Sequence, residues 1–195
     1  MTIRQRLYKS VYPFWMFFQK LNDRKKKILF NEGSKKAMLS FYDLNSILND
    51  GNKFSFEQLR GKKVLLVNTA SDCLYTNQYK ELEKLYQQYH NQLIILGFPS
   101  NDFGRQEKGD DNNIAEFCKM NFNISFLLMK KTVIRKRSYQ NEIYQWLTDA
   151  TKNGWNDKPP EWNFSKYLVN EEGVLTYYFS PEISPLSKDI LNAIS

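Results

Sequence analysis

The chain has 195 residues and a net charge of +7, and 42% of its residues are hydrophobic, which suits one soluble domain with a single core. Its two cysteines, Cys73 and Cys118, are too few for a disulfide scaffold, and with one histidine they exclude a Cys/His zinc site. Ten of the 28 Lys and Arg residues lie in residues 1–37, so the rest of the chain is nearly neutral. A nucleic-acid-binding domain carries its charge on the folded body, which argues against nucleic acid as a partner.

Residues 1–37 are predicted to form a basic, aromatic arm outside the main domain. The uncharged run 10–18 is shorter than the roughly 20 residues that cross a membrane, and no small-residue cleavage site follows it. Pro13 favours a short helix over 13–21, which a linker joins to the domain. Two interpretations stay open: the arm contacts an anionic membrane surface peripherally, or it packs on the domain or on a second subunit.

Residues 38–195 are predicted to form one α/β domain. In chain order, the patterns predict a hairpin turn at Asp50-Gly51, a buried strand over 62–70, a helix over 77–90, a buried strand over 93–99, helices over 111–121 and 141–151, a hairpin over 166–179 that turns at Glu172-Gly173, and a last helix that begins at Pro185 with Ser184 as its cap. The first strand–helix–strand unit predicts a right-handed crossover with parallel strands. A central mixed sheet flanked by helices, in this order, is typical of a thioredoxin-like fold.

Cys73 stands where the strand 62–70 passes into the helix 77–90. Sites in open α/β sheets form at the carboxyl ends of strands, where helix N-termini also point. Unpaired N–H groups and the helix dipole favour a thiolate, which is the reactive form of cysteine. The position predicts a reactive cysteine, and a buried inert cysteine is the alternative.

Four stretches, in order, resemble the signatures of the glutathione peroxidase family. They are GKKVLLVNTASDC with the following T-x-QYKELEKLY, then ILGFPSNDFGRQEKG, then IAEFC, and then WNFSKYLVNEEG. Together they cover about residues 39–192. The resemblance implies that Cys73 is the peroxidatic residue and that Gln106, Trp162 and Asn163 complete the catalytic site.

The implied reaction explains these residue types. A thiolate splits the peroxide O–O bond, and uncharged donors stabilise the oxygen that departs. Amide and indole N–H groups of Gln106, Trp162 and Asn163 are such donors. Taken singly, each has a plainer interpretation: a core aromatic for Trp162, a surface loop residue for Gln106, and a turn residue for Asn163.

Cys118 matches, by the same resemblance, the resolving cysteine of the two-cysteine, thioredoxin-dependent branch. Its place on an apolar helical stripe also fits a packed core cysteine. A disulfide needs Cα atoms within about 7 Å. We therefore predict that the helix 111–121 opens locally before Cys118 meets Cys73.

The expected function is that of a thiol peroxidase reducing hydrogen peroxide or organic and lipid hydroperoxides. The resemblance implies no cofactor and no metal, with thioredoxin or glutathione as the thiol reductant. The basic run 130–137 either docks an acidic reductase or is a solvated face. A cytoplasmic location is expected, with peripheral membrane contact through the arm as an option, and the chain is a monomer or a dimer.

Leu74 and Asn77 depart from the family pattern, which has glycine and proline there. Glycine permits left-handed backbone and close approach of substrate, so Leu74 is expected to narrow the pocket or strain the loop. Leu74 leaves open a redox-inactive thioredoxin-like binding protein, and a peroxide-sensing thiol relay is a separate alternative function.

Overall fold

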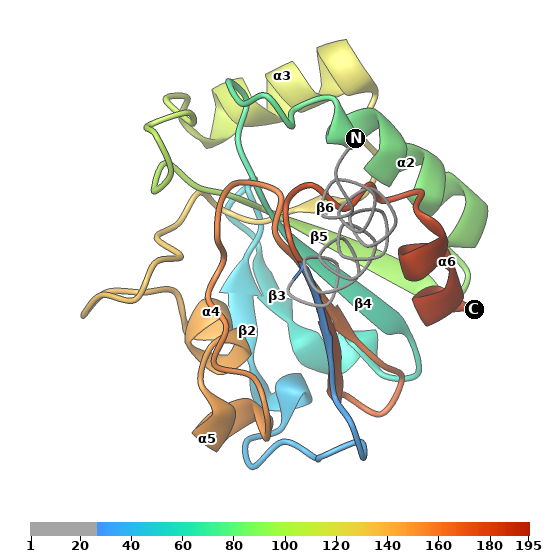
Figure 1. The fold of residues 1–195 in the computed structure, drawn as a ribbon. Coiled ribbons are helices and arrows are strands. Elements are labelled where there is room, and N and C mark those ends of the chain that lie inside the picture. Colours follow the sequence, from blue (N-terminus) through green and yellow to red (C-terminus); the bar gives the residue numbers. More distant parts are fainter. Residues whose placement is uncertain (1–26) are drawn as a thin grey trace, which may run out of the picture.

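A six-stranded mixed sheet forms the centre of the computed structural model, which describes residues 27–195. Its strands are β1 (Ile28–Phe30), β4 (Lys63–Thr69), β5 (Leu93–Pro99), β6 (Leu127–Leu128), β7 (Lys166–Val169) and β8 (Leu175–Phe179). They lie in the order β1-β8-β7-β4-β5-β6 (Figure 1). β4, β5 and β6 are parallel, and the other neighbours pair antiparallel. The helix predicted over 13–21 lies outside the described residues.

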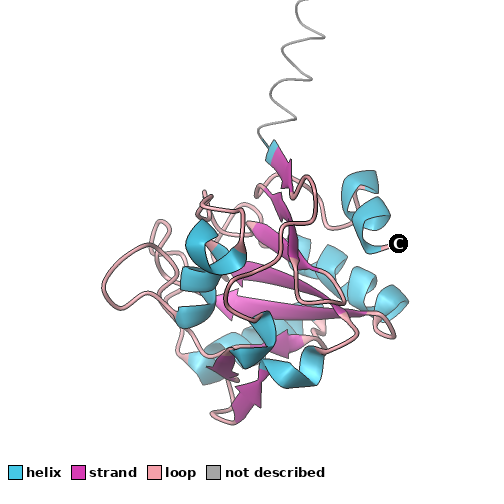
Figure 2. Cartoon of the chain, turned by 90° about the horizontal axis from the view of Figure 1, so that it is seen from below, coloured by secondary structure: helices cyan, strands magenta, loops and turns pink. Residues whose placement is uncertain are grey.

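Helices cover both faces of this sheet (Figures 1 and 2). The α-helices are α2 (Gln78–Tyr89), α3 (Asp111–Phe122), α4 (Glu142–Leu147), α5 (Ala150–Asn153) and α6 (Lys188–Ile194). The 3-10 helices are η1 (Phe41–Asp43) and η2 (Phe56–Leu59), and β2 (Asn45–Ile47) pairs with β3 (Lys53–Ser55) in a separate hairpin. Within residues 27–195, no helix has both the length and the apolar character that a bilayer crossing requires.

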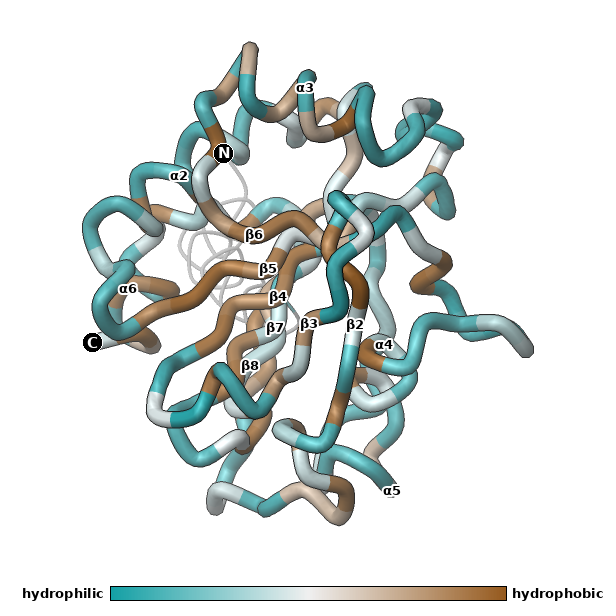
Figure 3. Tube along the Cα trace, turned by 180° about the vertical axis from the view of Figure 1, so that it is seen from behind, coloured by the Kyte–Doolittle hydropathy of each residue, from teal (hydrophilic) through white to brown (hydrophobic). Residues whose placement is uncertain are grey.

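The core is divided between the two faces of the sheet by the alternation along β4. Val64 and Leu66 pack in one buried cluster with α4 and the 3-10 helices. Leu65 and Val67 pack in the other, with α2, α3 and α6. Successive side chains of a strand point to opposite faces, so a strand buried on both faces is continuously apolar. Figure 3 shows this as brown colour along β4 and β5.

The predicted thioredoxin-like architecture is confirmed by these elements. β4, α2 and β5 form the predicted crossover with parallel strands, in register from Lys63 opposite Leu93 to Thr69 opposite Pro99. The hairpins predicted at 50–51 and 172–173 are present as β2–β3 and β7–β8.

The predicted boundary between arm and domain needs a correction. Residues 28–30, which we assigned to the arm, form β1 and pair with β8 through Leu29 opposite Tyr178. The short apolar run Ile28–Phe30 covers an edge of the sheet that β8 leaves open, a pairing that sequence patterns do not reveal.

Two predicted helices also differ in the structure. The helix predicted over 141–151 is broken into α4 and α5, because Asp149 has extended backbone and its side chain caps a new helix by accepting the Thr151 N–H. The last helix begins at Lys188 with Ser187 as its cap, rather than at Pro185. Ser184 caps no helix, since its hydroxyl accepts the Leu186 N–H at 3.1 Å in the preceding turn.

Candidate functional site

Cys73 lies half-buried in the loop that joins β4 to α2. Its N–H donates to Thr76 Oγ1 at 3.0 Å, and that hydroxyl donates to the Ala70 carbonyl at 3.0 Å. The Tyr75 N–H donates to the Cys73 sulfur at 3.5 Å. An N–H donor stabilises negative charge on the atom that accepts it. The loop therefore holds a half-buried cysteine with one backbone donor directed at its sulfur.

The first turn of α2 does not supply that donor. The N–H groups of its first three residues donate to carbonyls of the preceding turn, the shortest bond being from Gln78 to Tyr75 at 2.8 Å. Asn77, at the N-cap, makes no side-chain capping bond. The expectation that unpaired N–H groups of this helix act on Cys73 is wrong, because the turn before the helix already uses them.

Leu74 neither narrows the site nor strains the loop. Its side chain is 97% exposed, and its backbone is not in the left-handed region. The chain turns so that this side chain extends into solvent, away from the core that Cys73 borders. The expected effect of replacing the family's glycine is therefore wrong for this loop.

Gln106 lies in the loop after β5, which folds back against the cysteine loop. Gly104 and Arg105 just before it adopt left-handed backbone, with φ of 61° and 53°. The Gln106 carbonyl then accepts the Asp72 N–H at 3.0 Å. Gln106 is thus attached to the residue that precedes Cys73.

Trp162 and Asn163 lie in the turn before β7, where Asn68 of β4 anchors them. The Asn68 side chain donates to the Trp162 carbonyl at 2.9 Å, and the Asn68 carbonyl accepts the Phe164 N–H at 2.6 Å. The Trp162 ring packs on Phe103, with centroids 5.5 Å apart, and stays 38% exposed. Trp162 is therefore a surface aromatic of the site and not a core residue.

One hydrogen bond joins the two donor loops directly. Asn163 is fully buried, and its Nδ2 donates to Gln106 Oε1 at 2.9 Å. Gln106 Nε2 and Trp162 Nε1 then have no hydrogen-bond partner among residues 27–195. They are neutral donors that a substrate oxygen can use.

The Cys73 sulfur has no direct hydrogen bond to Gln106, Trp162 or Asn163 within residues 27–195. The connection runs through the backbone of the cysteine loop and through β4. Catalytic hydrogen bonds are often long before substrate binds and shorten in the complex. The donors and the sulfur therefore lie on loops that backbone and side-chain hydrogen bonds connect.

Cys118 is buried in α3, and only 1% of it is exposed. Burial raises the pKa of its thiol from 9 to about 11, contact with the Tyr79 hydroxyl lowers that pKa, and the charge of Glu107 raises it. Cys118 belongs to the same apolar cluster that Cys73 borders. Both thiols are free, and they face the same side of the sheet.

Lys166 is a fully buried cation beside this turn. Its Nζ donates to three backbone carbonyls, those of Phe164, Pro181 and Ile183, at 2.8, 3.4 and 2.7 Å. No carboxylate forms a salt bridge with it among residues 27–195. Burial lowers the pKa of Lys166 to about 7, and the charges of Glu81 and Glu182 oppose that shift.

Lys166 gives the stability of the fold a specific pH dependence. The unfolded chain, in which Lys166 has its ordinary pKa of 10.5, keeps a proton that the folded chain releases above about pH 7. The free energy of unfolding is therefore expected to rise with pH between 7 and 8.5, by up to about 1 kcal/mol per pH unit. Urea unfolding at a series of pH values measures this slope.

Lys166→Met is the matched variant, because methionine fills similar space and does not titrate. We expect the slope to be much smaller in this variant. The range stops below pH 9 because the raised pKa of Cys118 gives an opposite slope above that value. Parallel pH profiles of the two proteins would contradict the assignment.

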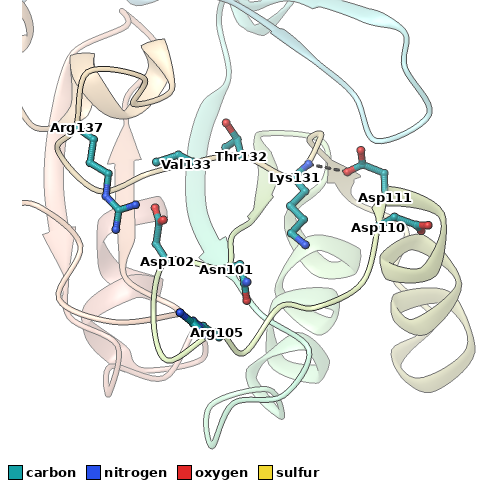
Figure 4. Close-up of a pocket in the computed structure, with 9 residues that line it drawn as sticks. All are labelled: Asn101, Asp102, Arg105, Asp110, Asp111, Lys131, Thr132, Val133 and Arg137. Atoms are coloured by element: carbon teal, nitrogen blue, oxygen red, sulfur yellow. Dashed lines mark hydrogen bonds between the residues drawn. The ribbon is translucent and has the colours of Figure 1, made fainter.

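A pocket of about 720 Å³ has Asn101, Asp102 and Arg105, from the loop that leads to Gln106, among its lining residues (Figure 4). Asp102 lies between Arg105 and Arg137, and its carboxylate accepts the Ile134 N–H at 2.7 Å. Neither arginine forms a salt bridge among residues 27–195. The pocket is therefore lined by two guanidinium groups, and one of them belongs to Arg105, the residue that precedes Gln106.

The predicted basic run 130–137 borders both this pocket and the site. The Arg135 guanidinium lies over the Phe103 ring at 5.7 Å, and Phe103 in turn contacts Trp162. Among residues 27–195, no group of three His, Cys, Asp or Glu side chains has the geometry to hold a metal ion.

Three residues of the site were missed in the sequence. Asn68 and Glu107 lie within the first and second family-like stretches, but only the structure shows that one anchors Trp162 and the other binds Ser71. Thr76 is the threonine of T-x-QYKELEKLY in the first stretch, but only the structure shows that its hydroxyl accepts the Cys73 N–H. Their partners lie far away in the chain or depend on loop geometry, so patterns alone do not identify them.

A sequence family, two relatives and one solved structure each match more than half of this chain. The sequence family described as Glutathione peroxidase matches residues 41–148, a segment that includes Cys73, Gln106 and Cys118. Glutathione peroxidase-like peroxiredoxin 2 of Saccharomyces cerevisiae is 44% identical over 151 residues, which cover 77% of this chain and 93% of that protein. Glutathione peroxidase-like peroxiredoxin gpx1 of Schizosaccharomyces pombe is 44% identical over 156 residues, covering 78% and 98%. The crystal structure of Trgpx in apo form has 30% identity and a TM-score of 0.62, covering 81% and 97%.

Proposed function

Because this chain belongs to the glutathione peroxidase family and is a thiol peroxidase, we propose that Cys73 is the nucleophile that peroxide oxidises. The observation that supports this role is the placement of its sulfur. It is half-buried at the end of β4, accepts the Tyr75 N–H, and lies in a loop attached to Gln106. Accessible cysteines whose surroundings stabilise negative charge are the reactive ones.

The proposed reaction is a displacement at oxygen. The Cys73 thiolate attacks one peroxide oxygen, the S–O bond forms as the O–O bond breaks, and the sulfur supplies the electron pair. The other oxygen leaves as hydroxide or alkoxide and takes a proton to become water or alcohol. The free N–H groups of Gln106 and Trp162 would stabilise that departing charge, and Asn163 holds the Gln106 amide in place. Cys73 becomes a sulfenic acid.

Cys118 is proposed to resolve the sulfenic acid by forming a disulfide with Cys73, with water as the other product. In the folded state, its burial and its thiol pKa of about 11 both oppose this attack. Opening of α3 would remove both obstacles, since it exposes the thiol and restores its ordinary pKa. Ile114 and Cys118 are the only fully buried side chains of α3, which favours such an opening.

A thiol reductant is the co-substrate of this family, and we propose that here it is a dithiol protein of the thioredoxin type. A disulfide between Cys73 and Cys118 is the natural substrate of a dithiol, which reduces it through a mixed disulfide. The Arg135 guanidinium lies over Phe103, which packs on Trp162, and Arg105 lines the neighbouring pocket. These basic side chains suit an acidic partner surface. Glutathione is the alternative, and parallel assays with each reductant decide between them.

Replacing the donors tests the proposed site. Gln106→Ala and Asn163→Ala are each expected to slow the first oxidation of Cys73 by about 10- to 100-fold, because they remove a donor or its support. Stopped-flow mixing with hydrogen peroxide measures the second-order rate constant. Gln145→Ala is a matched control, because it removes a glutamine of α4 whose amide donates to the Gln140 carbonyl and not to a residue of the site. Equal rates in all four proteins would remove Gln106 and Asn163 from the site.

A peroxide-sensing relay is the second candidate function. The 97% exposed Leu74 beside the nucleophile offers an apolar contact for a protein that receives the disulfide. A relay would show fast first oxidation of Cys73 and slow turnover with every reductant, whether a small thiol or a dithiol protein.

The cytoplasmic location, and the contact of residues 1–37 with a membrane or a second subunit, stay proposals that rest on the sequence alone.

A further inference from the structure

Glu107 is a buried carboxylate that contacts the cysteine loop directly. Only 1% of it is exposed, and its Oε2 accepts both the N–H and the hydroxyl of Ser71, at 2.9 and 2.8 Å. Its backbone N–H donates to Asn101 Oδ1 at 3.0 Å, which fixes the other end of the residue. No lysine or arginine forms a salt bridge with it among residues 27–195.

A second bond between the same two loops lies immediately beside this one. The Asp72 N–H donates to the Gln106 carbonyl at 3.0 Å. Two consecutive residues before Cys73 are therefore attached to two consecutive residues of the donor loop. We propose that Glu107 is a positioning residue, which holds the Cys73 loop at a fixed distance from the donors that Gln106 presents; this inference rests on the proposed role of Cys73.

The surroundings of Glu107 explain why the loop needs this attachment. A cavity of about 320 Å³ lies between the cysteine loop and α3, and Ser71, Glu107 and Ile114 are among its lining residues. Packing alone therefore does not hold Ser71 in place on that side. Burial raises the pKa of the Glu107 carboxyl, the Ser71 hydrogen bonds lower it, and so does the charge of Lys131. The two Ser71 donors thus offset the free-energy cost of burying the Glu107 carboxylate.

The chain contains a similar contact that involves neither the cysteine loop nor the loops of Gln106 and Trp162. Glu83 of α2 is also buried, and its carboxylate accepts the N–H and the hydroxyl of Ser125, at 2.9 and 2.6 Å. Removing either glutamate deletes two bonds from a serine, and removing Glu83 also deletes the bond that its Oε1 accepts from Gln87 Nε2 at 2.6 Å. Only the Glu107 contact lies beside Cys73. Comparing the two glutamates therefore separates an effect on the position of Cys73 from an effect on the stability of the fold.

The test compares Glu107→Ala with Glu83→Ala in the full chain. We expect Glu107→Ala to lower the second-order rate constant for Cys73 oxidation by about tenfold or more, because small displacements of reacting groups are costly. Glu83→Ala is expected to change that rate constant by less than about twofold while losing similar thermal stability. Glu107→Gln should recover most of the rate, since the amide oxygen still accepts from Ser71.

If Glu107→Ala does not fold, Ser71→Ala and Ser125→Ala replace the pair, because each deletes one hydroxyl bond from the matching contact. A selective loss of rate in Ser71→Ala would then support the proposal. Equal rates in the two members of either pair would overturn it. Failure of the proposed function looks different, since then the wild-type protein itself shows no peroxide-dependent oxidation at Cys73.

Discussion

Replacing Cys73 with serine is expected to abolish peroxide reduction. The hydroxyl of serine stays protonated near neutral pH and has no oxidation chemistry with peroxide, so the displacement at oxygen loses its nucleophile. Loss of a nucleophile costs on the order of 10⁴-fold or more in catalytic efficiency. Peroxide consumption in the presence of a thioredoxin system, and separately of glutathione, measures the effect with each reductant.

The thermal unfolding midpoint of Cys73→Ser is the control for this substitution, because it shows whether the variant keeps the fold. Cys73 borders the apolar cluster of α2 and α3 without being fully buried, so serine should leave the thermal unfolding midpoint nearly unchanged. A Cys73→Ser protein that unfolds normally and still consumes peroxide at more than a small fraction of the wild-type rate would place the chemistry elsewhere.

Replacing Cys118 with serine should separate the two halves of the cycle. The first oxidation of Cys73 is expected to keep its rate, because Cys118 lies in α3 and does not contact the sulfur through a hydrogen bond. Turnover with a dithiol protein is expected to fall by about a hundredfold or more, because an intramolecular thiol is lost and an external thiol must replace it. Stopped-flow oxidation and steady-state assays measure the two steps.

Intact-mass analysis after one equivalent of peroxide provides the matching chemical evidence. The wild-type chain should lose two hydrogens as the disulfide forms, whereas Cys118→Ser should gain one oxygen. Cys118 would have no resolving role if the wild-type chain, like the variant, gained one oxygen and did not lose two hydrogens. Because Cys73 and Cys118 are the two cysteines of the chain, no second thiol pair complicates this result.

The fold was predictable from sequence where local patterns are strong. The run from Val64 to Val67 is apolar at every position because β4 is buried on both faces, and α2 follows with a clear helical period. Predictions failed where a single side chain determines where a helix begins or ends. Asp149 breaks a helix that its apolar period continues, and Ser187 rather than Ser184 caps the last one.

The site was predictable only in part, for a similar reason. Cys73 is identified by its place between a strand and a helix, which is local. The bond from Asn163 to Gln106 joins residues 57 positions apart, and the bond from Ser71 to Glu107 spans 36 positions. The periodicity of apolar residues in the sequence does not indicate such long-range contacts. A family resemblance identified Gln106 and Asn163 because it carries information about the folded site, but it gave no reason to single out Glu107.

The most direct test of the nucleophile is chemical trapping of its oxidised form. Cys118→Ser protein is treated with one equivalent of hydrogen peroxide in the presence of dimedone, which reacts with sulfenic acids, and tandem mass spectrometry locates the adduct. We expect a single adduct, on Cys73. An unmodified Cys73 in protein that has consumed the peroxide would contradict the assignment of this sulfur as the atom that peroxide oxidises.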